Sequence, residues 1–67
     1  MAVVKVIELI AESSESWEAA TKVAVAEAAK TVRNIQNVYI ENLKALVENN
    51  KIVGYRVNAK ITFIVQD

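Results

Sequence analysis

The stretch that decides the fold is IVGYRVNAKITFIVQ, which runs from Ile52 to Gln66. Its side chains follow the period-2 pattern of a β-strand with one apolar face. The apolar face carries Tyr55, Val57, Ala59, Ile61, Phe63 and Val65, and the other face carries Arg56, Asn58, Lys60, Thr62 and Ile64. No other strand candidate in the chain is as long, so we expect the remaining elements to pair with it or pack on it.

The composition predicts one small domain, residues 1–67, that associates with copies of itself. A chain of 67 residues leaves much of its surface exposed, and it has no cysteine for a disulfide or a thiolate metal site. Yet 54% of its residues are apolar, more than such a small monomer can bury. We therefore expect part of the apolar surface to be buried between subunits of a homo-oligomer.

Charge and residue types argue against several classes of function. Eight basic residues balance eight acidic ones, so no net field attracts nucleic acid or an anionic membrane. No apolar run approaches the roughly 20 residues that span a bilayer, and we expect a cytoplasmic protein with no signal peptide. Without histidine the chain lacks the usual general base near neutral pH and the commonest metal ligand. We predict that it is not an enzyme, with no catalytic residue and no metal site.

The first half of the chain predicts a strand followed by a long amphipathic helix. The β-branched run from Val3 to Ile10 is typical of a strand. Ser13 is a candidate N-cap, and helix formers dominate from about Ser14 to Ile35. The face of this helix that should lie on the sheet carries Trp17, Ala20, Thr21, Ala24, Val25, Ala28, Val32 and Ile35.

The second half predicts a β-hairpin. Val38 to Glu48 is a second strand candidate, although its alternation is imperfect. Asn49, Asn50 and Lys51 follow as turn residues, and asparagine tolerates left-handed dihedrals. The only glycine, Gly54, marks a bulge or a close approach of backbone near the start of the last strand.

This order predicts an α+β fold of β-α-β-β type. The helix returns the chain so that strands one and two run in the same direction. If strand three pairs with both, it lies between them in a three-stranded antiparallel sheet of order 1-3-2, wrapped on the one amphipathic helix. The sheet face with Arg56, Asn58 and Lys60 is too mixed for a monomer core and suits a partly wet interface or a cavity wall.

The sequence resembles the dodecins, small flavin-binding proteins of strand-helix-strand-strand topology that assemble as hollow dodecamers. The resemblance covers nearly the whole chain. Its most specific pieces are KVIEL at Lys5 to Leu9, SWE at Ser16 to Glu18, KTVRN at Lys30 to Asn34 and the tyrosine Tyr55. It implies a homododecamer that stores a flavin (riboflavin, FMN or FAD) as a small-molecule ligand.

Two positions depart from the flavin-binding pattern. Asn37 stands where these dodecins have a tryptophan that stacks on the isoalloxazine ring, and Arg56 stands where they have a glutamine that contacts the ring edge. An aromatic stacking contact is worth about 1–3 kcal/mol, so its loss weakens binding by roughly one to two orders of magnitude. Tyr39 lies about 7 Å from Asn37 on the same strand face. We take Asn37 and Tyr39 as cavity wall and Arg56 as polar contact.

Other interpretations remain open at this point. Tyr39 could instead fill a subunit interface, with Arg56 paired to an acidic neighbour across a subunit boundary. The alternative function is a divergent dodecin shell that no longer binds flavin and acts as a structural or metal-binding assembly.

Three further features have a structural interpretation that we favour over a functional one. Trp17 is best explained as a core or interface anchor. The acidic group Glu8, Glu12, Glu15 and Glu18 matches no calcium loop and is typical of a solvated face. Lys30 and Arg33 would share a helical turn and hold a phosphate or a neighbouring carboxylate; without a glycine-rich loop we favour the carboxylate.

Overall fold

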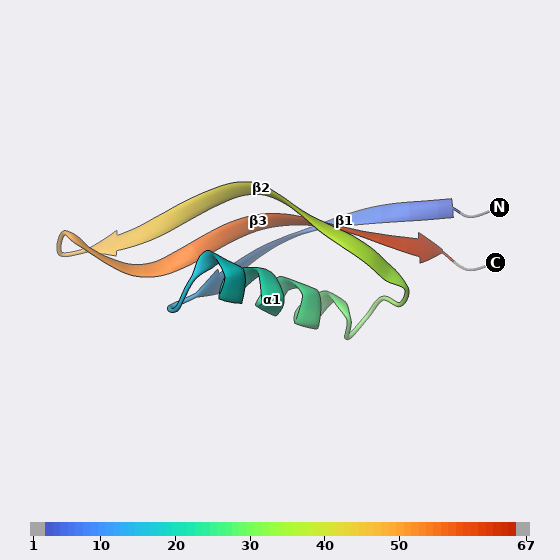
Figure 1. Ribbon diagram of the computed structural model, residues 1–67, viewed down its shortest axis with the longest axis horizontal. Coiled ribbons are helices and arrows are strands. Elements are labelled where there is room, and N and C mark those ends of the chain that lie inside the picture. The colour runs from blue at the N-terminus through green and yellow to red at the C-terminus, as the bar shows by residue number, and fades with distance from the viewer. Residues whose placement is uncertain (1–2, 66–67) are drawn as a thin grey trace.

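The computed structural model describes residues 3–65. It contains strand β1 (Val3–Ser13), helix α1 (Trp17–Ala28), strand β2 (Ile35–Glu48) and strand β3 (Lys51–Val65), in that order. The strands form one antiparallel sheet with β3 between β1 and β2, and α1 lies along one side of it (Figure 1). The predicted α+β class, the element order and the strand order 1-3-2 are confirmed.

All three strands differ at their ends from the predicted ranges. β1 continues past Ile10 because residues 11–13 pair with β3 as far as the partners Ser13 and Tyr55. β2 begins at Ile35 rather than Val38, since Ile35 already pairs with Phe63. β3 begins one residue before the predicted start and is described to Val65; the predicted last residue, Gln66, lies outside the described residues.

The helix is much shorter than predicted. It begins after Ser16, whose backbone is extended and whose Oγ accepts a hydrogen bond from the Ala19 N–H at 2.9 Å, so Ser16 and not Ser13 is the N-cap. The Oγ of Ser13 instead accepts from the Glu15 N–H and forms a turn before the helix. The helix ends at Ala28, so Val32 and Ile35 do not belong to its sheet-facing side.

Tertiary hydrogen bonding explains this early end. After Ala28 the backbone makes i→i−3 bonds from Lys30 and Thr31, and Asn34 then adopts a left-handed conformation with φ 62°. The carbonyl of Asn34 accepts a bond from the Ile64 N–H at 3.1 Å, which ties this loop to the end of β3. The chain therefore leaves the helix toward the sheet, although its residues favour helix.

The hairpin is as predicted. Asn49 and Asn50 have φ values of 51° and 65°, and Glu48 pairs with Lys51 on either side of them. Two residues with positive φ form the tight turn whose twist matches that of the flanking strands. Gly54 lies beside a bulge, as expected, because the neighbouring pairs leave Val53 as an extra residue. The atom nearest to a Cβ on Gly54 would be a side-chain atom, Leu46 Cδ1 at 3.3 Å, rather than backbone.

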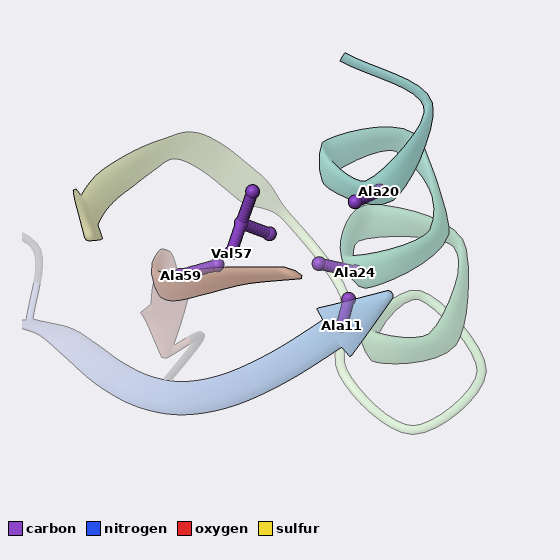
Figure 2. Close-up of a cluster of buried hydrophobic side chains, with 5 residues drawn as sticks. All are labelled: Ala11, Ala20, Ala24, Val57 and Ala59. Atoms are coloured by element: carbon purple, nitrogen blue, oxygen red, sulfur yellow. The ribbon is translucent and has the colours of Figure 1, made fainter. Parts of the chain in front are cut away.

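The core between helix and sheet is small and rich in alanine. Ala20, Ala24 and Ala28 recur every four residues along α1, and all are buried. Ala20 and Ala24 meet Val57, Ala59 and Ala11 on the sheet (Figure 2). The short side chains allow close packing of helix on sheet, and Val57, Ala59 and Ile61 confirm the predicted apolar face of β3.

The chain is elongated and exposes more surface than a compact monomer of its mass. Its radius of gyration is 13.7 Å, against about 11 Å for a compact chain of this length. Its accessible surface is 5022 Å², against roughly 4,200 Å² for a compact protein of this mass. The tip of the hairpin and the ends of β1 and β3 extend beyond α1 (Figure 1).

Candidate functional site

The candidate site lies on the outer face of the sheet, which we define as the side turned away from α1. In β3 this face carries Arg56, Asn58, Lys60, Thr62 and Ile64, because they alternate with the buried residues. The neighbouring strands add residues that pair with these: Glu8 and Glu12 from β1, and Asn37, Tyr39 and Lys44 from β2. The mixed face expected from the sequence is therefore present.

Asn37 and Tyr39 lie together on this face. A register shift at Gln36 moves β2 by one residue, so that Ile35 pairs with Phe63 while Asn37 pairs with Thr62. Tyr39 then pairs with Lys60, and its side chain is 61% exposed. The structure thus offers an open aromatic ring next to an amide and an ammonium group.

Arg56 lies elsewhere on the outer face. It pairs with Glu12 on one side and Lys44 on the other, and its Nε–H donates to the Glu12 carboxylate at 2.7 Å. Lys60 lies four positions further along β3, roughly 13 Å away. Within one chain Arg56 is therefore not brought to Asn37 and Tyr39, and its acidic neighbour belongs to the same chain.

Lys60 is the centre of a charged cluster that sequence reasoning missed. Its Nζ lies 3.5 Å from Glu41 Oε1 and 3.6 Å from Glu8 Oε2. The carboxylate of Glu41, and more weakly that of Glu8, raise the pKa of Lys60. The alternation of β3 placed Lys60 on this face, but a second register shift beside Glu41 sets its partner. No sequence pattern contains that shift.

A small cavity of about 200 Å³ opens beside this cluster, lined in part by Glu8, Ile10, Glu41, Asn58 and Lys60. The Oδ1 atom of Asn58 is buried there and accepts no hydrogen bond. A buried amide oxygen without a donor is costly unless water or another group supplies one. This part of the outer face is a polar recess, and Lys60 in its lining is the strand partner of Tyr39.

Trp17 does not belong to the outer face. Its Nε1–H donates to the carbonyl of Lys44 at 3.0 Å, and its ring meets Tyr55 edge to face with centroids 4.9 Å apart. Although 37% exposed, the ring joins the start of α1 to the hairpin. Its role as an anchor is confirmed.

The acidic residues near the start of the chain form no metal centre within residues 3–65. Glu8 and Glu12 are held in ion pairs, and within residues 3–65 no group of three or more acidic residues is arranged to hold a metal ion. Lys30 pairs with the Glu27 carboxylate at 2.7 Å, as the carboxylate interpretation predicts. The prediction that Arg33 shares its helical turn is wrong, because α1 ends at Ala28. No helix among the described residues is long and apolar enough to cross a bilayer.

Comparison with known proteins connects this fold to one family. The family model named Dodecin matches residues 3–66. The chain belongs to the dodecin family. This confirms the resemblance seen in the sequence, and dodecins are small binding proteins. No curated protein matches the chain.

Solved dodecins share the architecture along the whole chain. A point variant of Thermus thermophilus dodecin is 27% identical, with a TM-score of 0.93 and full coverage of both chains. A calcium-chelating antigen of Mycobacterium tuberculosis, calcium dodecin, is 30% identical, with a TM-score of 0.83; the match covers 96% of this chain and 91% of that one. Its structure is described as having a novel calcium-binding site. Dodecin from Streptomyces coelicolor has the same fold at 20% identity, with a TM-score of 0.92 and coverage of 98% and 94%.

Proposed function

We propose that this dodecin assembles into a homododecamer and stores a small aromatic ligand in cavities between subunits, in the cytoplasm. The ligand implied by the family is a flavin. The observation that carries the proposal is the open Tyr39 ring on the mixed outer face, between Asn37 and the polar recess at Lys60.

The exposed apolar surface supports the assembly. Val4, Val6 and Ile10 on the outer face are each more than half exposed, and so are Leu43 and Val47 on the hairpin. Burial of apolar surface contributes about 25 cal/mol per Å², and the excess of exposed surface over a compact monomer is available for it. A shell of copies would cover these side chains.

The residues of the site would have separate roles. Tyr39 would supply the aromatic face in place of the missing indole, and Asn37 would line the cavity as an amide. Arg56 is too far along the sheet to act on the ligand of its own chain, so we assign its contact to a ligand held mainly by a neighbouring copy. Its guanidinium offers five donors for a carbonyl-rich ring edge or a phosphate.

A fluorescence titration tests the flavin form of the proposal. Purified oligomer is titrated into riboflavin and into FMN, and quenching of flavin emission is followed. We expect quenching that Tyr39→Ala weakens roughly tenfold, as the loss of one stacking contact predicts. Tyr39→Phe keeps the ring and serves as the matched control. No quenching by the unmodified oligomer would rule the flavin form out.

A gain-of-function variant distinguishes a flavin site that lacks only its stacking ring from a cavity that no longer has the shape of a flavin site. Asn37→Trp restores the stacking side chain on the outer face, where Asn37 pairs with Thr62. If the cavity still has the shape of a flavin site, this variant should bind at least tenfold more tightly than the natural chain. An Asn37→Trp oligomer that retains no flavin colour once excess riboflavin has been removed would show that the cavity itself has changed.

The second candidate is a dodecin shell that holds metal ions and no flavin. The calcium dodecin of Mycobacterium tuberculosis favours it. Since residues 3–65 contain no metal-binding group within one chain, carboxylates from several copies would have to meet. Calcium binding by calorimetry, with magnesium as control, tests this candidate. Binding that survives in Tyr39→Ala would separate it from ligand storage.

A further inference from the structure

A second and larger cavity lies on the other side of the sheet, where the loop after α1 passes the end of β3. Its volume is about 520 Å³, within the range of small-molecule sites. Lys5 and Arg33 line it together with Thr31 and Asn34, and Phe63 and Val65 supply apolar surface. Lys5 and Phe63 pair in the sheet on the α1 side. Ile64 also borders this cavity, but no residue that lines the recess at Lys60 lines it.

Hydrogen bonds hold the loop that carries Arg33. The carbonyl of Asn34 accepts from the Ile64 N–H at 3.1 Å, and the N–H of Val32 donates to the Ala28 carbonyl at 2.9 Å. The hydroxyl of Thr31 also donates to the Ala28 carbonyl. Arg33 is thus fixed at the backbone beside the end of β3, which lowers the ordering cost of binding there.

The charges of the described residues that line this cavity are unbalanced, although the whole chain is neutral. Among the described residues that line it none is acidic, while Lys5 and Arg33 are both exposed. The ion pairs within residues 3–65 engage Lys30, Arg56 and Lys60 and include neither of these two cations. Two cations beside one cavity attract a compact group with two negative charges.

We propose that this cavity binds an aromatic phosphate monoester. A phosphate monoester carries close to two negative charges at neutral pH, which matches one lysine and one arginine. The arginine fork suits phosphate oxygens, and Phe63 and Val65 offer apolar surface to the ring of the ester. The site does not depend on the ligand of the outer face.

Phenyl phosphate is a suitable probe because it combines a dianion with one ring. Calorimetric titration of the assembled protein should show saturable binding that weakens as sodium chloride is raised. Lys5→Gln and Arg33→Gln should each weaken binding about tenfold, the loss expected for one charge-assisted hydrogen bond. Lys51→Gln, at the hairpin tip, is the matched control and should bind as the natural chain does. Circular dichroism checks that each variant is folded.

Several results would overturn the proposal. Inorganic phosphate is the comparison probe, and equal affinity for it and for phenyl phosphate would remove the role of Phe63 and Val65. An equal loss of affinity in Lys51→Gln would show attraction to charge in general. Absence of phenyl phosphate binding to the natural chain at probe concentrations up to about 10 mM, tenfold above a Kd of 1 mM, would refute the site. Retained binding in Tyr39→Ala, by contrast, is expected here and separates this site from the outer-face proposal.

Discussion

Val57 offers the clearest test of where the stability of the subunit comes from. Its side chain is fully buried between α1 and the sheet. Val57→Ala removes two carbons, worth about 0.8 kcal/mol each on transfer from water. The cavity left behind, of about 50 Å³, adds roughly 1 kcal/mol if it does not collapse. Because Ala20, Ala24 and Ala59 have no side-chain torsion that could fill the gap, we expect a loss near 2–3 kcal/mol.

Urea unfolding followed by circular dichroism measures this loss. Both proteins must be compared at one protomer concentration, because unfolding of an assembly depends on concentration. Val53→Ala is the matched control: the same change on the same strand, at a residue 46% exposed beside a register shift. It should cost less than about 1 kcal/mol. If Val53→Ala cost as much as Val57→Ala, the helix-sheet core would not be the main source of stability.

Three more predictions follow from single features of the structure. Leu43, 57% exposed on the hairpin, should be covered in the assembly, so Leu43→Glu should give smaller particles by light scattering while Lys51→Glu should not; full-size Leu43→Glu particles would show that this surface is free. Asn34 has φ 62°, so Asn34→Ala should destabilise by about 1–2 kcal/mol and Asn34→Gly by only a few tenths; equal losses in urea would implicate the side chain instead. Lys60 has a pKa raised from its usual 10.5 by Glu41 and then Glu8, so its stabilising contribution is complete below pH 10.5 and is lost as pH rises through the raised value. On the alkaline side, the stability difference between the natural chain and Lys60→Met should therefore shrink only above pH 10.5, and a difference that already shrinks between neutral pH and pH 10.5 would contradict this pairing.

Much of the candidate site can be predicted from local sequence patterns, but which side chains pair across strands depends on the strand register. Alternation along β3 is enough to place Asn58, Lys60 and Thr62 on one face, and the hairpin turn at Asn49 and Asn50 could be predicted from their tolerance of positive φ. The shift at Gln36 could not, since it depends on how β2 meets β3. That shift decides that Ile35 lies opposite Phe63, and the shift beside Glu41 brings the Glu41 carboxylate to Lys60.

The length of the helix likewise could not be predicted from local sequence preference. Residues 29–35 carry helix formers and apolar side chains at helical spacing, so local preference predicts continuation. The bond between the Asn34 carbonyl and the Ile64 N–H joins residues 30 positions apart. Propensities of a few tenths of a kcal/mol per residue yield to such contacts. The prediction of a helix reaching Ile35 failed for that reason.

The sequence by itself determined the α+β class, the strand order, the hairpin and the family, because these depend on side-chain periodicity, turn chemistry and short motifs. Only the tertiary structure decided which side chains meet: Arg56 with Glu12, Lys60 with Glu8 and Glu41, and Lys5 with Arg33 around one cavity. Pairing across strands depends on register and bulges. A shift of one residue moves each side chain of a strand to the other face of the sheet. A local sequence pattern does not indicate where such a shift occurs, so only the tertiary structure shows which residues form the site.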